Sequence, residues 1–117
     1  MNTSTIARCL IAFFFVASGS GKIFAFRQSS TILASIGFPI PTFFVTAFIA
    51  VEIAGGLGLF FNLWTSYMAV MLIVFLIFAT VTIHARFVRD PVSGTDQIVH
   101  MIKNIAIIGG LINFVAL

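Results

Sequence analysis

Long apolar stretches, separated by very few charged residues, dominate this chain. Of its 117 residues, 61% are hydrophobic and only 8% are Asp, Glu, Lys or Arg, and the mean hydropathy is +1.21. A soluble domain averages roughly 25% charged residues, and a small domain leaves much of its chain exposed to water. The composition therefore indicates a membrane protein. It excludes a soluble enzyme, a disordered chain and a disulfide-stapled secreted domain.

The apolar stretches are long enough to cross a bilayer as helices. A hydrocarbon core of about 30 Å requires roughly 20 residues at about 1.5 Å each, and a backbone inside lipid must satisfy its own hydrogen bonds. Four spans are predicted, at about 5–26, 41–61, 66–84 and 97–116. We expect residues 1–117 to form one all-α domain, a bundle of four transmembrane helices, with the first helix retained rather than cleaved as a signal peptide.

The segment between the first two spans, residues 27–40, predicts a short helix lying along the membrane interface. Ser29 or Ser30 is a suitable N-cap for this helix, and Gly37 is a suitable residue to end it. Pro41 then suits the first turn of the next span, where the missing N–H of proline is not needed.

The basic residues predict an orientation in the membrane. Arg8 lies on the side of the two termini, whereas Arg27, Arg86 and Arg89 lie on the other side, the last two in a polar loop at 85–96. Because cytoplasmic loops carry an excess of Lys and Arg, we expect the 85–96 loop in the cytoplasm and both termini outside. The six basic residues are scattered among apolar runs and form no patch, so no nucleic-acid partner is expected.

Small residues are placed where neighbouring helices would pack. Lipid supplies no hydrophobic drive between helices, so close approach through small side chains matters in a membrane bundle. The predicted packing positions are Gly21 in the first span, Gly55 and Gly56 in the second, and Gly109 and Gly110 in the fourth.

A few polar residues lie inside the predicted spans. Glu52 is near the middle of the second span, where an ionisable group costs at least about 2.5–3.5 kcal/mol by insertion scales and needs a partner. Lys22 and Lys103 are the candidate partners on other helices, and the long stem of Lys103 could cover a gap of about one turn. We predict a polar pocket formed by Ser18, Lys22, Glu52, His84, Lys103 and Asn104.

Two lysines and one carboxylate would give this pocket a net positive charge. It would suit an anionic or carbonyl-bearing amphiphile, such as a quinone head group or a lipid-like acid. The alternative is an intramembrane salt bridge that only fixes helix register. Cys9 is the sole cysteine, so no dithiol centre forms within the chain, and no metal-ligand spacing is present.

Several groups of residues carry a resemblance to a known family: Ser18-Gly19-x-x-Lys22, Gly37-x-Pro39-x-Pro41, Glu52-x-x-Gly55-Gly56-Leu57, His84, Gln97, and Lys103-Asn104-x-Ala106-x-x-Gly109-Gly110-Leu111. Their order resembles the DoxX family over nearly the whole chain. The resemblance implies a small multi-pass protein of the bacterial inner membrane with four helices. It also implies that the family's polar positions are Lys22, Glu52, His84, Lys103 and Asn104.

The chain departs from the family's pattern at two positions. Phe87 stands where the family tends to have Trp, and Met101 where it tends to have Phe. These changes concern details of the pocket more than the assignment. The family's similarity to the membrane subunit of a thiosulfate:quinone oxidoreductase, and the link of some members with oxidative-stress complexes, imply a redox connection.

The leading hypothesis is a DoxX-like protein that binds a quinone, or another anionic amphiphile, as part of a redox or stress-response assembly. It is not expected to be catalytic alone, holds no covalently bound cofactor, and would act with a redox partner protein in or at the membrane. Homo-oligomerisation is left open. The alternatives are a small proton-coupled exporter and a membrane scaffold or assembly factor with a purely structural Glu–Lys pair.

Overall fold

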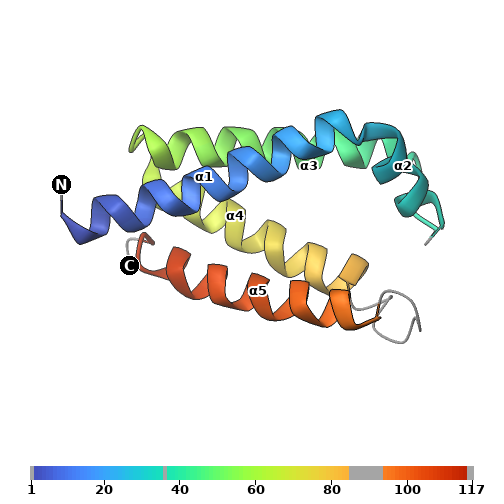
Figure 1. The fold of residues 1–117 in the computed structure, drawn as a ribbon. Coiled ribbons are helices and arrows are strands. Elements are labelled where there is room, and N and C mark those ends of the chain that lie inside the picture. Colours follow the sequence, from blue (N-terminus) through green and yellow to red (C-terminus); the bar gives the residue numbers. More distant parts are fainter. Residues whose placement is uncertain (1, 36, 85–93, 116–117) are drawn as a thin grey trace.

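A computed structural model describes the backbone of residues 2–35, 37–84 and 94–115, and the side chains of 2–35, 37–82 and 98–115. Within these ranges every regular element is helical and no strand is found. The elements are α1 (Thr3–Phe24), α2 (Phe26–Ser35), α3 (Pro41–Phe60), α4 (Thr65–Ala79), a π-helical turn η1 (Thr80–His84) and α5 (Gly94–Ile112) (Figure 1). The predicted all-α fold is confirmed.

Three helices are long and apolar enough to cross a membrane, namely Thr3–Phe24, Pro41–Phe60 and Thr65–Thr82. They match the first three predicted spans. The fourth apolar stretch forms a shorter apolar helix at Ile98–Ile112 within α5. The described part of the chain therefore has three clear spans and one shorter apolar helix, where the sequence predicts four full spans.

Helices α1 and α3 lie side by side along their length (Figure 1). Gly56 makes this possible, because a Cβ atom there would lie 2.8 Å from a Val16 methyl carbon and 3.1 Å from the Ala12 carbonyl oxygen. Gly55 similarly receives Leu72 of α4, whose Cγ would lie 2.8 Å from an added Cβ. Both glycines thus sit at close helix contacts in the interior of the bundle.

The other predicted packing glycines behave differently. A Cβ added at Gly21 or Gly109 would meet nothing within 4 Å among the described residues, and both positions are exposed. Gly110 faces Ile11, whose Cδ1 would lie 3.2 Å from an added Cβ. Gly21 and Gly109 therefore pack no helix here, because each falls on the outer face of its own helix.

The short helix between the first two spans is present as α2, but it begins earlier than the sequence predicts. Only Ala25 separates it from α1, and the N–H of Ser29 donates to the Ala25 carbonyl at 2.9 Å. Ser29 and Ser30 therefore lie within the helix and do not cap it. The chain bends at Ala25 and turns α2 back toward the start of α3, as Figure 1 shows.

The end of α2 follows the prediction made for Gly37. Its φ of +87° lies in the left-handed region, which glycine adopts without steric penalty. Its N–H donates to Ala34 O at 3.1 Å, and the Phe38 N–H donates to Leu33 O at 3.1 Å, which is the Schellman pattern. Pro41 then begins α3, as expected.

The two ends of the molecule differ in what they contain. The N-terminus and the C-terminus lie at the same end, and α2 lies at the opposite end (Figure 1). At the terminal end, the guanidinium of Arg8 donates to the carbonyls of Leu59 and Phe60 and so caps α3. The predicted orientation stays a prediction, since Arg86 and Arg89 of the 85–96 loop lie outside the described residues.

Candidate functional site

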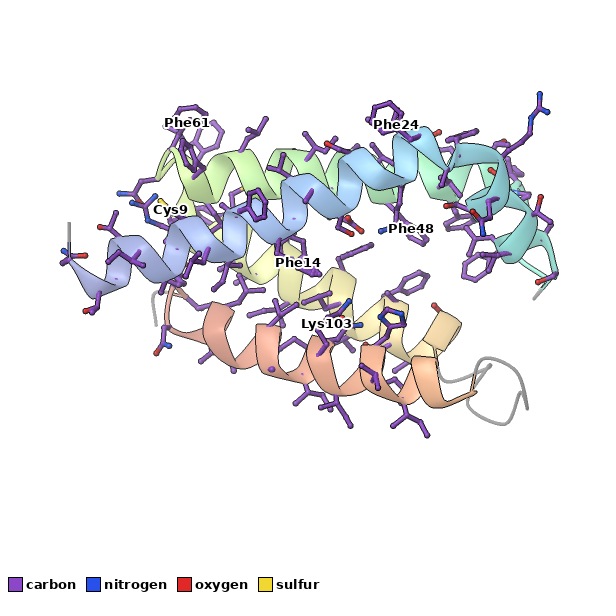
Figure 2. All side chains as sticks on the ribbon, in the orientation of Figure 1. Cys9, Phe14, Phe24, Phe48, Phe61 and Lys103 are labelled. Carbon is purple, nitrogen blue, oxygen red and sulfur yellow. The ribbon has the colours of Figure 1, made fainter. Side chains whose placement is uncertain are left out.

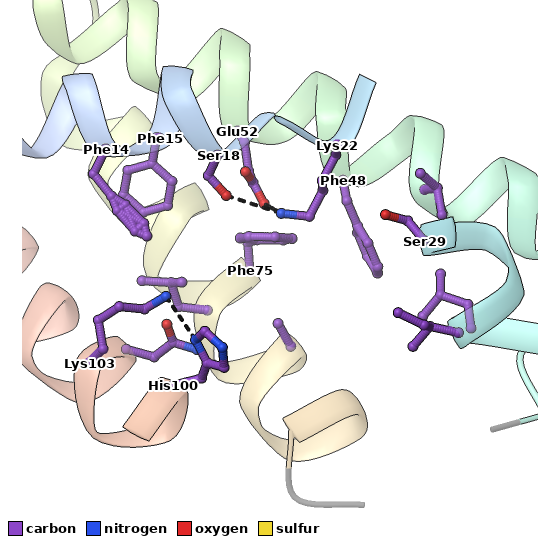
Figure 3. Close-up of a pocket in the computed structure, with 16 residues that line it drawn as sticks. Phe14, Phe15, Ser18, Lys22, Ser29, Phe48, Glu52, Phe75, His100 and Lys103 are labelled. Atoms are coloured by element: carbon purple, nitrogen blue, oxygen red, sulfur yellow. Dashed lines mark hydrogen bonds and ion pairs between the residues drawn. The ribbon is translucent and has the colours of Figure 1, made fainter. Parts of the chain in front are cut away.

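A cavity of about 300 Å³ lies between the α1–α3 pair and the α4–α5 pair, with α2 contributing to its wall (Figure 3). Its lining combines aromatic rings with most of the polar side chains predicted inside the spans. The lining residues are Phe14, Phe15, Ser18, Lys22, Ser29, Ile32, Leu33, Val45, Phe48, Glu52, Phe75, Leu76, Ala79, His100, Lys103 and Asn104.

Glu52 is the most buried charged group of the cavity, with 2% of the residue exposed. The Lys22 ammonium lies 2.6 Å from Glu52 Oε1 and donates to Ser18 Oγ at 3.1 Å (Figure 3). Ser18 and Lys22 are four residues apart on α1, so both project from one face of that helix. The structure thus brings together the α1 and α3 residues that the sequence predicts for the pocket.

Gly19 allows this ion pair to form close to the helix axes. A Cβ added to Gly19 would lie 2.7 Å from Ile53 Cγ1 and 3.3 Å from Glu52 Cβ. A side chain at this position would push α3 away from α1 and lengthen the distance between Lys22 and Glu52. Gly19 was not among the predicted packing positions, although it lies in the Ser18-Gly19-x-x-Lys22 motif.

The second carboxylate oxygen of Glu52, Oε2, differs from Oε1 in its hydrogen bonding. Among the described residues, Glu52 Oε2 is buried and has no hydrogen-bond partner. An ionised carboxylate is an acceptor with about four lone-pair sites, and a buried acceptor without a donor is destabilising. The cavity is therefore built around a carboxylate whose hydrogen bonding is incomplete.

Lys103 lies on the other side of the cavity, on α5. Its Nζ is 3.3 Å from His100 Nδ1 and 5.0 Å from the centroid of the Phe14 ring, a cation–π distance. Within the described residues no carboxylate lies within 4 Å of it, so it does not reach Glu52 as the sequence suggested. The reason is geometric, because the intervening cavity separates α5 from α3 at this level (Figure 3).

Asn104 closes the wall next to Lys103. It is 3% exposed, and its Nδ2 donates to Thr80 Oγ1 at 3.0 Å. Thr80 is the first residue of η1, so this hydrogen bond ties α5 to the π-helical turn. Such turns are frequent at functional sites.

The two histidines of the chain differ, because His84 was predicted for the pocket and His100 was not. His84 ends η1, but its side chain lies outside the described residues, so its predicted place at the rim of the pocket is untested. His100 lines the cavity instead and was not predicted as a site residue. Its position three residues before Lys103 on α5 was the available sequence signal, because residues at that spacing share a helix face.

Aromatic rings form the apolar walls of the cavity, and these walls were not predicted. Phe48 of α3 and Phe75 of α4 have ring centroids 5.4 Å apart in an edge-to-face arrangement. Figure 2 shows Phe14, Phe48 and Lys103 directed between the helix pairs, whereas Phe24 points away from them. The chain has fifteen phenylalanines, and nothing in the sequence distinguishes those that face a cavity from the others.

The fold and the site define a small helical membrane protein with a buried ion pair inside an aromatic cavity. The family model described as DoxX matches residues 3–85, and the chain belongs to the DoxX family. It is also 27% identical over 107 residues to the "Inner membrane protein YqjF" of Escherichia coli (strain K12), covering 92% of this chain and 77% of that protein. No solved structure matches the chain.

Proposed function

We propose that this protein binds an amphiphile with a carbonyl or anionic head group, a quinone first among them, in the cavity around Glu52. The protein would act as the membrane subunit of a redox or stress-response assembly in the bacterial inner membrane. The observation that supports this most is a cavity with aromatic walls that holds a cationic side chain, Lys103, which can donate to such a head group.

The size and walls of the cavity fit a substituted six-membered ring. A dry engineered cavity of about 150 Å³ binds benzene, so about 300 Å³ accommodates a ring with several substituents. Phe14, Phe48 and Phe75 supply apolar surface for such a ring. Lys103 and His100 supply polar atoms on one side and Glu52 an acceptor on the other, which is the usual division of a small-molecule site.

The proposal of a partner protein follows from the cysteine content. Disulfide exchange within one chain requires two thiols, and Cys9 is the only cysteine. We therefore place the chain in an assembly with a peripheral or membrane redox protein. When a quinone is bound it would supply electron-carrying capacity, and the ammonium of Lys103 would donate to one of its carbonyl oxygens.

A titration tests this proposal. The purified full chain in lipid nanodiscs is titrated with decylubiquinone, and binding is followed by calorimetry. The wild type should bind saturably, and Lys103→Met should weaken binding by about tenfold or more because a charge-assisted contact is lost. Arg27→Met is the matched control, since Arg27 is an exposed cation outside the cavity lining. If the wild type does not bind decylubiquinone, or if Lys103→Met and Arg27→Met bind it with equal affinity, the proposal is overturned.

A scaffold function is the second candidate, and one observation favours it. The Lys22–Glu52 ion pair is complete without any ligand, as a register-fixing salt bridge would be. If this were the only role, a stable partner would copurify with the chain and Lys103→Met would leave that complex intact. The exporter alternative has less support, because Glu52 Oε1 already accepts from the ammonium of Lys22, which also donates to Ser18 Oγ.

A further inference from the structure

We propose that the cavity discriminates between the two redox forms of its ligand and favours the reduced, hydroxyl-bearing form. The inference rests on the proposed function, since it names which member of the quinone class fits the site. It concerns the hydrogen-bonding groups that the cavity offers to a ligand.

Glu52 sets the preference. A carboxylate only accepts hydrogen bonds, and Glu52 Oε1 already accepts from Lys22 while Oε2 has no donor among the described residues. The terminal torsion of Glu is broad, so a small rotation presents an oxygen to the cavity while the other stays near Lys22. The hydroxyl of a quinol donates to that oxygen. The carbonyl of a quinone has no hydrogen to donate and meets the carboxylate as a second acceptor.

Lys103 acts on the other end of the ligand and does not discriminate. An ammonium only donates, and Lys103 lies across the cavity from Glu52, beside His100 (Figure 3). The oxygen of a quinone carbonyl and the oxygen of a quinol hydroxyl both carry lone pairs and both accept from it. Lys103 therefore adds affinity for both forms, and we assign the difference between them to Glu52.

The expected discrimination is large. A site built to hydrogen-bond a ligand hydroxyl strongly rejects an analogue that lacks it, because the buried polar group is then left unpaired. We expect the quinol to bind about tenfold to a hundredfold more tightly than the quinone. Since tight binding of the reduced form stabilises it, each tenfold preference raises the midpoint potential of the bound two-electron couple by about 30 mV.

Three ligands with one ring test the inference on the wild-type chain. Decylubiquinone, its quinol and the dimethyl ether of that quinol are titrated anaerobically against the full chain in nanodiscs. The ether has the same ring as the quinol but no hydroxyl hydrogen, so it should bind as weakly as the quinone. Equal affinity for quinone and quinol, or an ether that binds as tightly as the quinol, would refute the inference while leaving the proposed function standing.

Two variants then locate the preference. Glu52→Gln should bring the two affinities to within about threefold, because a carboxamide both donates and accepts. Lys103→Met should weaken both forms and preserve their ratio. A preference that survives Glu52→Gln would contradict the role given to Glu52. Failure of all three ligands to bind the wild type would remove the proposed function, and the inference with it.

Discussion

The ion pair between Lys22 and Glu52 makes a prediction about stability that depends on its unequal burial. Removing Lys22 by Lys22→Met leaves a carboxylate that is 2% exposed without its cation. Removing the charge of Glu52 by Glu52→Gln leaves an ammonium that is 29% exposed and can reach a more polar environment on its flexible stem. The two single substitutions should therefore differ, although they break the same interaction.

The magnitudes follow from the same asymmetry. Breaking a buried ion pair by removing one partner costs about 3–5 kcal/mol. Because Lys22 is partly exposed, the lower end, about 3 kcal/mol, is expected for Lys22→Met. Glu52→Gln keeps an acceptor for Lys22 and should cost about 1 kcal/mol. In the double variant neither charge is stranded, so its cost should fall below the sum by about 1–2 kcal/mol, at the upper end of interhelical couplings measured in membranes.

Reversible SDS unfolding in mixed micelles, followed by far-ultraviolet circular dichroism, measures these three free energies of unfolding. Substitution of Arg27 by Met serves as a control for the loss of an exposed cation and should change stability by less than about 0.5 kcal/mol. Equal costs for the two single variants would refute the argument from burial. Strict additivity in the double variant would show that Lys22 and Glu52 do not stabilise each other.

Three further predictions concern helix contacts and use the same unfolding measurement. Gly56→Ala should destabilise the protein by about 1–3 kcal/mol through overpacking. Gly109→Ala should be neutral or stabilising by up to about 1 kcal/mol, because its site is open. The reverse order of the two variants would contradict the packing described. Arg8→Gln should cost about 1 kcal/mol because the cap on α3 is lost. Asn104→Leu should cost about 0.6 kcal/mol through loss of its bond to Thr80, and an unchanged stability would show that this bond is not needed.

The fold was predictable where local chemistry determines it. Apolar length fixes α1, α3 and α4, because a backbone in lipid has few alternatives to a helix. Gly37 and Pro41 each act through their own backbone geometry, so the end of α2 and the start of α3 agree with expectation. The start of α2 was misplaced, because α1 continues almost directly into it and the hydroxyl of Ser29 is not needed as a cap.

The contacts between helices were less predictable, because they depend on which face of a helix meets a neighbour. Gly21 and Gly19 are two residues apart on α1, yet only Gly19 lies against α3. Gly58 of α3 also lies at a close contact, since an added Cβ would lie 2.7 Å from Met68 Cγ of α4. Successive residues are about 100° apart around a helix axis. The rotation of the helix about that axis therefore decides which glycine meets a neighbour, and the sequence does not specify that rotation.

The site shows the same division between local and long-range information. A carboxylate near the middle of a span must find a partner, so the sequence correctly predicts that Glu52 and Lys22 meet. The position of Lys103 depends instead on how far α5 stands from α3. That distance is set by contacts between helices far apart in sequence, and it places Lys103 against Phe14 and not against Glu52.

The cavity itself results from unequal packing on the two sides of α1. Toward α3, glycines such as Gly56 bring the backbones into contact. Toward α5, at the level of the cavity, the ring of Phe14 meets Lys103, and these bulky side chains stand between the helices. A bundle packed through glycines on every side would have no room for a ligand, and one packed through rings on every side would not bring Lys22 to Glu52. The combination keeps the ion pair tight and leaves space beside it, which is why we assign a binding role to this space.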